Sequence, residues 1–377
     1  MRRRTLDPRP NWQQRVEQYG LHFHTLRGEP YWDESACYTF SKYEIDTIER
    51  ATYALFDMCV ELVQHVIDEK MFGLFLIPPE YEDLVVQSWD DEHPSIYGRF
   101  DLAFDGVGPP KMLEFNADTP TGLVEAGVAQ WFWLKDVDER ADQFNSIHER
   151  LIEGWKHIHA GDDTPIHFAA ISGEVEDYIT VEYLRDTAIQ AGFKTDYLDV
   201  EAIGWDQNRR TFVDRTGRPI QRIFKLYPWE WLIRDNFGKN ILQSKTRWME
   251  PAWKMILSSK SILPLLHQLN PDSPYLLPAW FDEPESGDYV RKPIHAREGA
   301  NIRVVRNGRT ELETDGPYQV GRDVVYQQLF PLPSYDGRYP VIGSWVINGW
   351  AAGIGIREDD GIVTTNTSRF IPHQMTD

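Results

Sequence analysis

Arg99-Phe-Asp-Leu-Ala-Phe-Asp-Gly-Val-Gly-Pro-Pro-Lys-Met-Leu-Glu-Phe-Asn116 decides the fold, because it predicts a strand, a Gly/Pro-rich turn and a second strand. Residues two apart on a strand point to the same face, so Arg99 with Asp101 and Glu114 with Asn116 form two polar pairs that a hairpin brings side by side. Mg²⁺ prefers such oxygen ligands and completes its coordination with waters and nucleotide phosphates. The stretch therefore predicts a Mg²⁺–nucleotide site. The alternative is a solvated hairpin with ordinary surface charges.

The composition is that of a globular protein with room for a large core. The chain has 377 residues, of which 41% are hydrophobic, enough for one large domain or two to three lobes. Its 14 Trp, 17 Tyr and 18 Phe fill cores, but such residues also line clefts. The two cysteines fit neither a disulfide framework nor a zinc pattern, and Cys59 is expected to be a buried thiol on the apolar side of a helix.

The charge balance restricts the partners. With 39 Lys plus Arg against 59 Asp plus Glu, the net charge is −20, which disfavours nucleic acid and anionic membranes. Such a surface is compatible with a cationic substrate such as an amine, although solubility alone would also explain it. We find no apolar run of membrane-spanning length and no apolar signal-peptide core, so we expect a cytoplasmic protein without a membrane partner.

Hydrophobic periodicity and turn residues predict a mixed α and β chain with a strand-rich final third. Ser41 and Glu44 form a capping box for the first long helix. The predicted helices cover 42–69, 121–135, 141–159, 178–190 and 252–269. The predicted strands cover 166–171, 194–200, 220–227, and several segments within 288–330 and 338–371. Residues 160–165 read as a loop between lobes, followed by a βαβ unit.

Further motifs extend the nucleotide interpretation. Lys292 ends a strand and precedes a short loop containing Gly299, a pattern that suits phosphate, although a surface β-turn would look the same. The strand from Tyr326 runs into a Pro-rich exit and could border an adenine or simply be an edge strand stopped by proline. Arg357 is a candidate anion binder or a partner in a rim ion pair.

The other motifs narrow the chemistry. The pairs His22/His24 and His157/His159 lack the accompanying Cys or carboxylate spacing of a metal site. Neither a Gly-x-Ser-x-Gly elbow nor a Cys–His hydrolase pattern occurs. An Mg²⁺ cluster, Lys260 and Lys292, a glycine loop and several arginines suit ATP-driven chemistry better than hydrolysis or redox.

A set of motifs resembles the glutathionylspermidine synthase family over residues 10–374, in the single-domain form described as acid–amine ligases. The motifs are Tyr19-Gly-Leu-His-Phe-His24, Gly28-Glu-Pro-Tyr-Trp32, Arg99-Phe-Asp101, Glu114-Phe-Asn-Ala-Asp-Thr-Pro120, Phe224-Lys-Leu-Tyr-Pro-Trp-Glu230, Glu250-Pro-Ala-Trp-Lys254, Lys292-Pro with Arg297-Glu-Gly-Ala-Asn301, Ile342-Gly-Ser-Trp345 and Gly353-Ile-Gly-Ile-Arg-Glu-Asp359. The resemblance implies an α+β fold: a permuted ATP-grasp with a β-rich, ATP-binding lid lobe at 255–330 and a βαβ substrate lobe at 160–235.

The resemblance also implies roles for individual residues. Asp101, Glu114 and Asn116 would bind Mg²⁺. ATP would be bound by Lys260, Lys292 and Gly299 at the phosphates and by Gln327, Gln328, Leu329 and Phe330 at the adenine. The catalytic arginines would be Arg99, Arg297 and Arg357, and the substrate-facing residues Thr119, Thr121, Glu176 and Asp177.

The chain departs from the family pattern at substrate positions. Thr119 and Thr121 stand where the bifunctional members have serines that help hold glutathione, and Leu226 replaces a substrate-contacting threonine. The bifunctional members also carry an amidase domain ahead of the synthetase, so amidase activity is not expected of this sequence.

We therefore expect a carboxylate–amine ligase that joins a small-molecule carboxylic acid or peptide to an amine through an acyl phosphate. The alternatives are a catalytically inactive nucleotide-binding protein and a phosphotransferase that stops at the phosphorylated product.

Overall fold

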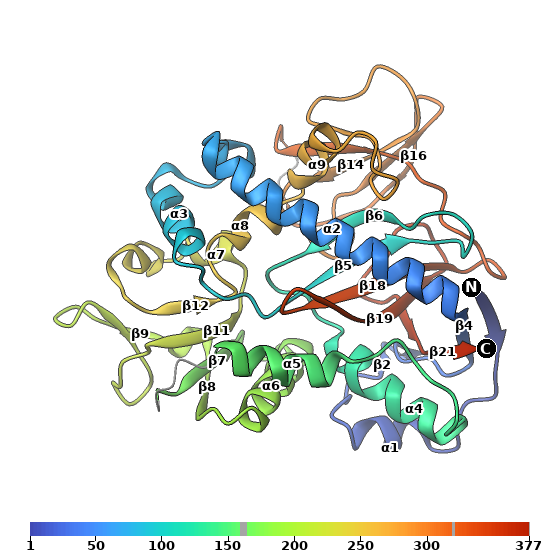
Figure 1. Ribbon diagram of the computed structural model, residues 1–377, viewed down its shortest axis with the longest axis horizontal. Coiled ribbons are helices and arrows are strands. Elements are labelled where there is room, and N and C mark those ends of the chain that lie inside the picture. Colours follow the sequence, from blue (N-terminus) through green and yellow to red (C-terminus); the bar gives the residue numbers. More distant parts are fainter. Residues whose placement is uncertain (159–163, 319–320, 377) are drawn as a thin grey trace.

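The computed structural model describes residues 1–158, 164–318 and 321–376. Within them the chain forms a mixed α+β structure in which a long helix, α2 (Lys42–Asp68), crosses the central sheet (Figure 1). Its capping box forms as predicted, with Ser41 and Glu44 bonded to each other. The central sheet has the strand order β20-β19-β18-β5-β6. Its strands are β5 (Tyr97–Ala103), β6 (Lys111–Asn116), β18 (Tyr339–Ile347), β19 (Trp350–Asp359) and β20 (Arg369–Ile371).

The predicted hairpin is the β5–β6 pair of this sheet. Its antiparallel register sets Arg99 opposite Asn116 and Asp101 opposite Glu114. The intervening Phe100 and Phe115 are buried and stack with a ring-centroid separation of 4.0 Å in the core under α2. Because strand side chains alternate, burying these two phenylalanines puts the four polar residues on the opposite face.

A parallel sheet with the order β12-β11-β7-β8 contains the predicted βαβ unit. Helix α6 (Val175–Gln190) connects the two strands of that unit and packs against α5 (Ile147–Ile158). The strands are β7 (Ile166–Ala170), β8 (Thr195–Asp199), β11 (Arg222–Leu226) and β12 (Arg247–Met249). The loop predicted at 160–165 lies largely outside the described residues.

A second antiparallel sheet has the order β13-β17-β14-β15-β16 and is covered by α9. Its strands are β13 (Ala279–Trp280), β14 (Tyr289–Pro293), β15 (Arg303–Arg306), β16 (Arg309–Glu313) and β17 (Val324–Gln328). Both chain ends enter a three-stranded sheet, where β1 (Arg2–Thr5) and β21 (His373–Thr376) flank β4 (Ala36–Ser41).

The remaining elements are short. The helical ones are α1 (Trp12–Glu17), η1 (Phe72–Phe75), η2 (Pro79–Tyr81), α3 (Glu82–Asp90), a π-helical segment η3 (Glu125–Ala129), α4 (Gln130–Val137), η4 (Val200–Ala202), α7 (Trp229–Leu232), η5 (Gly238–Gln243), α8 (Lys254–Leu257) and α9 (Ile262–Leu269). The strands are β2 (Thr25–Leu26), β3 (Glu29–Pro30), β9 (Gly204–Asp206) and β10 (Thr211–Val213). Among the described residues, none of the helices combines the length and the apolar character that crossing a membrane requires.

Two predicted helices were too long. The helix expected at 252–269 breaks between α8 and α9, because the backbone N–H of Lys260 donates to the carbonyl of Ile294, directly after β14. The helix expected at 141–159 begins only at Ile147, because the preceding residues form backbone hydrogen bonds with β19. The Phe144 carbonyl accepts from the N–H of Ile354, and the Ser146 N–H donates to the carbonyl of Ala352. Residue 159 lies outside the described part. In both places a segment far along the chain forms hydrogen bonds with backbone groups that a continuous helix would use.

Candidate functional site

The four polar residues of the β5–β6 hairpin form one connected cluster, which we call the hairpin cluster. The Arg99 guanidinium donates to both carboxylate oxygens of Asp101, with Nε–Oδ1 and Nη2–Oδ2 distances of 2.6 and 3.0 Å. The Asn116 amide nitrogen donates to Asp101 at 3.2 Å and to Glu114 at 3.3 Å. One point between the two carboxylates is therefore within reach of all three oxygen-bearing side chains.

This donor set fits a hard divalent cation. The Asn116 amide lies where it contacts both carboxylates, and exchanging its nitrogen and oxygen by rotation turns that contact into an oxygen ligand. Burial raises the pKa of Glu114, but the positive charges of Lys260, Lys292 and Arg99 outweigh it and lower that pKa to about 2. Glu114 is thus ionised near neutral pH, as a Mg²⁺ ligand must be.

Two lysines border the cluster from the second antiparallel sheet and the α8–α9 break. Lys260 Nζ lies 3.2 Å from Glu114 Oε2 and donates to the Ala296 carbonyl at 2.6 Å. Lys292 Nζ donates to the Leu113 carbonyl at 2.9 Å and to Gln327 Oε1 at 2.7 Å. Burial lowers the pKa of Lys292 to about 8.

A cavity of about 850 Å³ opens beside the two lysines, and we call it the apolar cavity. Its walls carry Leu113, Val290, Ile302, Val304, Leu332 and Val341. The predicted cofactor-binding residues all line it: Lys260, Lys292, Gly299, Gln327, Gln328, Leu329 and Phe330. Apolar walls with a few convergent polar groups are typical of a small-molecule site.

Gly299 is required by the backbone at this place. Its φ of +68° is disfavoured for other residues, and an added Cβ would lie 2.6 Å from the Thr364 carbonyl oxygen. The loop that carries Arg297 and Gly299 therefore closes against the segment after β19, which supplies the other wall of the apolar cavity.

A second cavity of about 1480 Å³ meets the first, and we call it the charged cavity. The two share Asp101, Glu114, Arg297, Gly299 and Thr364 as lining residues. The predicted catalytic and substrate-facing residues all line the charged cavity: Arg99, Arg297, Arg357, Thr119, Thr121, Glu176 and Asp177. The structure thus brings every predicted site residue to one of two adjoining cavities, whose shared lining includes Asp101 and Glu114 of the hairpin cluster.

The acidic part of the charged cavity is incompletely neutralised. Burial and the neighbouring carboxylates of Glu176 and Glu174 raise the pKa of Asp177 to about 7. Burial and Glu176 also raise the pKa of Glu298. Since Asp177 and Glu298 resist ionisation beside other carboxylates, a bound cation here would be stabilised electrostatically.

The arginines retain unused hydrogen-bond donors. Arg297 donates to Glu230 Oε1 at 2.8 Å and to the Thr119 hydroxyl at 2.5 Å. Arg99 donates to the Thr121 carbonyl at 2.6 Å, and Arg357 to that of Thr365. Within the described residues, the buried Nε atoms of Arg297 and Arg357 have no hydrogen-bond partner. Guanidinium groups with free N–H donors beside a cavity are suited to binding an oxyanion.

Two further pairs at the site carry no role in the sequence analysis. Lys225 Nζ donates to Asp118 Oδ1 at 2.7 Å in an ion pair whose side chains are both 1% exposed, and the other Asp118 oxygen accepts from the backbone of Trp229 at 2.9 Å. The Tyr31 hydroxyl donates to Glu125 at 2.7 Å, and burial and Glu176 raise the pKa of Glu125 to about 7. For the Lys225–Asp118 pair, the available signal in the sequence was a lysine between the apolar residues Phe224 and Leu226 of a predicted strand.

Comparison with known proteins gives a consistent result. A family model described as "Glutathionylspermidine synthase preATP-grasp" matches residues 3–376. A Haemophilus influenzae protein named "Putative acid–amine ligase" is 40% identical over 97% of this chain and 97% of its own length. The Crithidia fasciculata trypanothione synthetase is 30% identical over 84% of this chain, which spans 53% of that protein.

Two more comparisons concern the share of a relative's length that this chain spans and the fold. The Escherichia coli bifunctional glutathionylspermidine synthetase/amidase is 28% identical over 89% of this chain, which spans 58% of it. The structure of a glutathione synthetase-like effector from Globodera pallida, in its apo form, covers 97% of this chain with a TM-score of 0.58 and 10% identity, over 96% of its own length. That likeness shows the fold alone, a mixed α+β fold of the glutathione synthetase type.

Proposed function

The chain belongs to the glutathionylspermidine synthase family, as its motifs predict, and on that premise we propose that it is an ATP-dependent acid–amine ligase. The observation that carries the proposal is the boundary shared by the two cavities. A phosphoryl donor in the apolar cavity and an acid in the charged cavity would meet at Asp101 and Glu114.

We assign the apolar cavity to ATP and the fold to a permuted ATP-grasp, with the lid lobe at 255–330 and the βαβ lobe at 160–235. Lys260, Lys292 and the backbone at Gly299 would hold the phosphates, and residues 327–330 would border the adenine. Asp101, Glu114 and Asn116 would hold Mg²⁺, which when bound neutralises phosphate charge during phosphoryl transfer.

The proposed reaction proceeds in two steps at this boundary. The substrate carboxylate attacks the γ-phosphorus of ATP, so that an acyl phosphate forms and ADP leaves. The neutral amine then attacks the acyl carbon, the amide forms and phosphate leaves. Arg99, with Arg297 and Arg357, would bind the acid and stabilise the oxyanion, and loss of one such preorganised donor typically costs about 10²–10³ in rate.

The acidic side chains of the charged cavity would receive the amine. Glu176 and Asp177 would attract its ammonium form, and a carboxylate whose pKa lies about 7 can take the proton that the amine must lose. Closing of the loop that carries Arg297 would exclude water, which otherwise hydrolyses an acyl phosphate.

The departures from the family pattern all lie on the substrate side. Thr119, Thr121 and Leu226 line the charged cavity, whereas none of them lines the apolar cavity. This distribution favours a changed acid or amine substrate with an intact ATP apparatus over loss of catalysis.

The test compares Asp101→Asn with Asp105→Asn, an exposed aspartate in the turn of the same hairpin whose amide replacement can still accept the turn hydrogen bonds. Each protein is incubated with ATP, Mg²⁺ and a metabolite extract, and the products are identified by mass spectrometry alongside ADP release. We expect an amide and ADP from the wild type and Asp105→Asn, and neither from Asp101→Asn.

Unchanged turnover in Asp101→Asn would refute the assignment of the hairpin cluster. ATP binding without ADP release would instead identify an inactive nucleotide-binding protein. A stable phosphorylated product without an amide would identify a phosphotransferase.

A further inference from the structure

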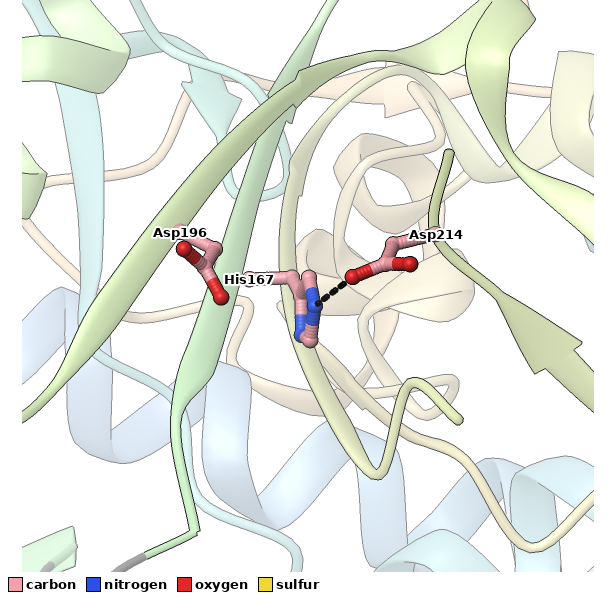
Figure 2. A group of neighbouring side chains, drawn as sticks. All are labelled: His167, Asp196 and Asp214. Atoms are coloured by element: carbon pink, nitrogen blue, oxygen red, sulfur yellow. Dashed lines mark ion pairs between the residues drawn. The ribbon is translucent and has the colours of Figure 1, made fainter. Parts of the chain in front are cut away.

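A cluster of three metal-ligating side chains lies in the parallel sheet, away from both cavities. His167 on β7 is in register with Asp196 on β8, and Asp214 follows β10 directly (Figure 2). Their ligand atoms lie within 4.8 Å of one another. His167 is near the start of β7, whereas the chain lines the charged cavity only after the other end of that strand, at Ile171.

The histidine is the unusual member of this cluster. Its side chain is 2% exposed, and neither ring nitrogen has a hydrogen-bond partner within the described residues. Its Nε2 faces Asp214 Oδ2 at 3.7 Å, too far for a hydrogen bond (Figure 2). Because nearly all buried polar groups in folded proteins have partners, an imidazole left without one between two carboxylates indicates a missing ligand.

The Asp214 carboxylate is held in place by the turn that begins at this residue. Asp214 Oδ1 accepts from the backbone N–H groups of Thr216 and Arg218 at 2.8 and 3.0 Å, which fixes its orientation. The Arg218 side chain contacts both Asp214 and Asp196, at 2.7 and 3.0 Å, and is 60% exposed. The cluster thus already holds one positive charge, on a side chain that can move into solvent.

We propose that His167, Asp196 and Asp214 bind one divalent cation of the Zn²⁺ class, and that Arg218 leaves the two carboxylates when the ion enters. One imidazole and two carboxylates are ligands that Zn²⁺ accepts, with a fourth position left for water. Asp196 is 40% exposed, so the ion can enter from that side. The ion would tie β7, β8 and the turn after β10 together, a structural function that is independent of the ligase reaction.

The arginine provides a test in which affinity increases. Arg218→Ala removes the competing cation from both Asp196 and Asp214, so we expect Zn²⁺ to bind about tenfold tighter or more. Arg209→Ala is the matched control: Arg209 is 62% exposed in the same lobe, its ion pair is with Asp206 instead, and the change in net charge is the same. We expect Arg209→Ala to bind Zn²⁺ as the wild type does.

The measurement is calorimetric titration of the full chain with Zn²⁺ alone, together with the shift in melting temperature. His167→Gln should bind one equivalent of Zn²⁺ fewer than the wild type. Asp196→Asn should lose the same equivalent, and because Asp196 is partly exposed this variant replaces His167→Gln if the latter does not fold. Anomalous scattering at the zinc edge from wild-type crystals should place the ion between His167 and the two aspartates.

Equal Zn²⁺ affinity and stoichiometry in the wild type, Arg218→Ala and Asp196→Asn would overturn the proposal. Anomalous density confined to the hairpin cluster would overturn it as well. Since the readouts are binding and position, they are independent of whether the ligase assignment holds.

Discussion

Replacing Lys292 with methionine should weaken nucleotide binding and at the same time stabilise the folded protein at neutral pH. Lys292 is 8% exposed and has no carboxylate within ion-pair distance among the described residues, since its ammonium donates to the Leu113 carbonyl and to Gln327. Methionine keeps the length of the buried stem and removes the charge. An ammonium held ready for phosphate is costly to bury before the phosphate arrives.

The structure gives the size of this effect. Burial lowers the pKa of Lys292 from 10.5 to about 8, which corresponds to a penalty of about 3 kcal/mol on the charged form. The variant also loses the hydrogen bonds to Leu113 and Gln327, and each loss lowers its stability by about 1 kcal/mol. The net stabilisation of Lys292→Met at pH 7 is therefore about 1 kcal/mol.

The sign of the pH dependence follows from the direction of the shift. Because the folded-state pKa lies below the unfolded one, the penalty is fully present below pH 8 and disappears as pH rises to 10.5. Above that range only the lost hydrogen bonds remain, so the variant becomes the less stable protein. The two stability curves should cross between pH 8 and 10.5.

Urea denaturation at several pH values measures the stability difference, and the ATP-dependent shift in melting temperature measures binding. Lys260→Met is the matched comparison, because Lys260 is paired with Glu114 at 3.2 Å and its loss should reduce both stability and affinity. A Lys292→Met protein that is less stable than the wild type at pH 7, or that binds Mg²⁺-ATP with unchanged affinity, would contradict this prediction.

Three other predictions follow from contacts at the site. Lys225→Met should destabilise the protein by about 3–5 kcal/mol in urea denaturation, because it leaves the Asp118 carboxylate buried without its partner; a cost below about 1 kcal/mol would contradict this. The KM for the amine should fall as pH rises through about 7, where Asp177 ionises, and a profile that persists in Asp177→Asn would exclude that residue as the cause. Gly343→Ala puts a Cβ 2.8 Å from Arg99 Cδ and so displaces the Arg99 guanidinium. We expect kcat to fall about 100-fold while ATP affinity is retained. A wild-type kcat would show that the position of this guanidinium does not matter.

The hairpin cluster was predictable because its signals are local. Alternation set Arg99, Asp101, Glu114 and Asn116 on one face, and the Gly/Pro turn set them side by side, as the observed register confirms. The capping box of α2 and the burial of Cys59 were predictable for the same reason. The assignment of Lys260 came from family resemblance, since nothing local to it indicates a phosphate-binding lysine.

The features that the sequence analysis missed depend on partners far along the chain. The break before α9 is set by Ile294, and the late start of α5 by Ala352. His167 could not be paired with Asp214 from spacing, because 47 residues and a sheet crossing separate them. Of the four histidines considered as metal ligands, His159 lies outside the described residues, and none of the other three belongs to such a cluster within the described part of the chain. His24, for example, contacts Thr25 and Glu17.

The two cavities draw most of their walls from different parts of the chain. The apolar cavity takes Val290, Lys292, Val304, Gln327 and Gln328 from the sheet of β14, β15 and β17, whereas the charged cavity takes Ile171, Glu174, Glu176 and Asp177 from the entry to α6. This separation makes the molecule modular for evolution and for engineering. Transplanting residues 171–177 together with 226–231 from a relative should transfer that relative's choice of amine or acid. The apolar cavity, which we assign to ATP, would stay unchanged. Short segment exchanges should therefore give ligases that form new amide bonds.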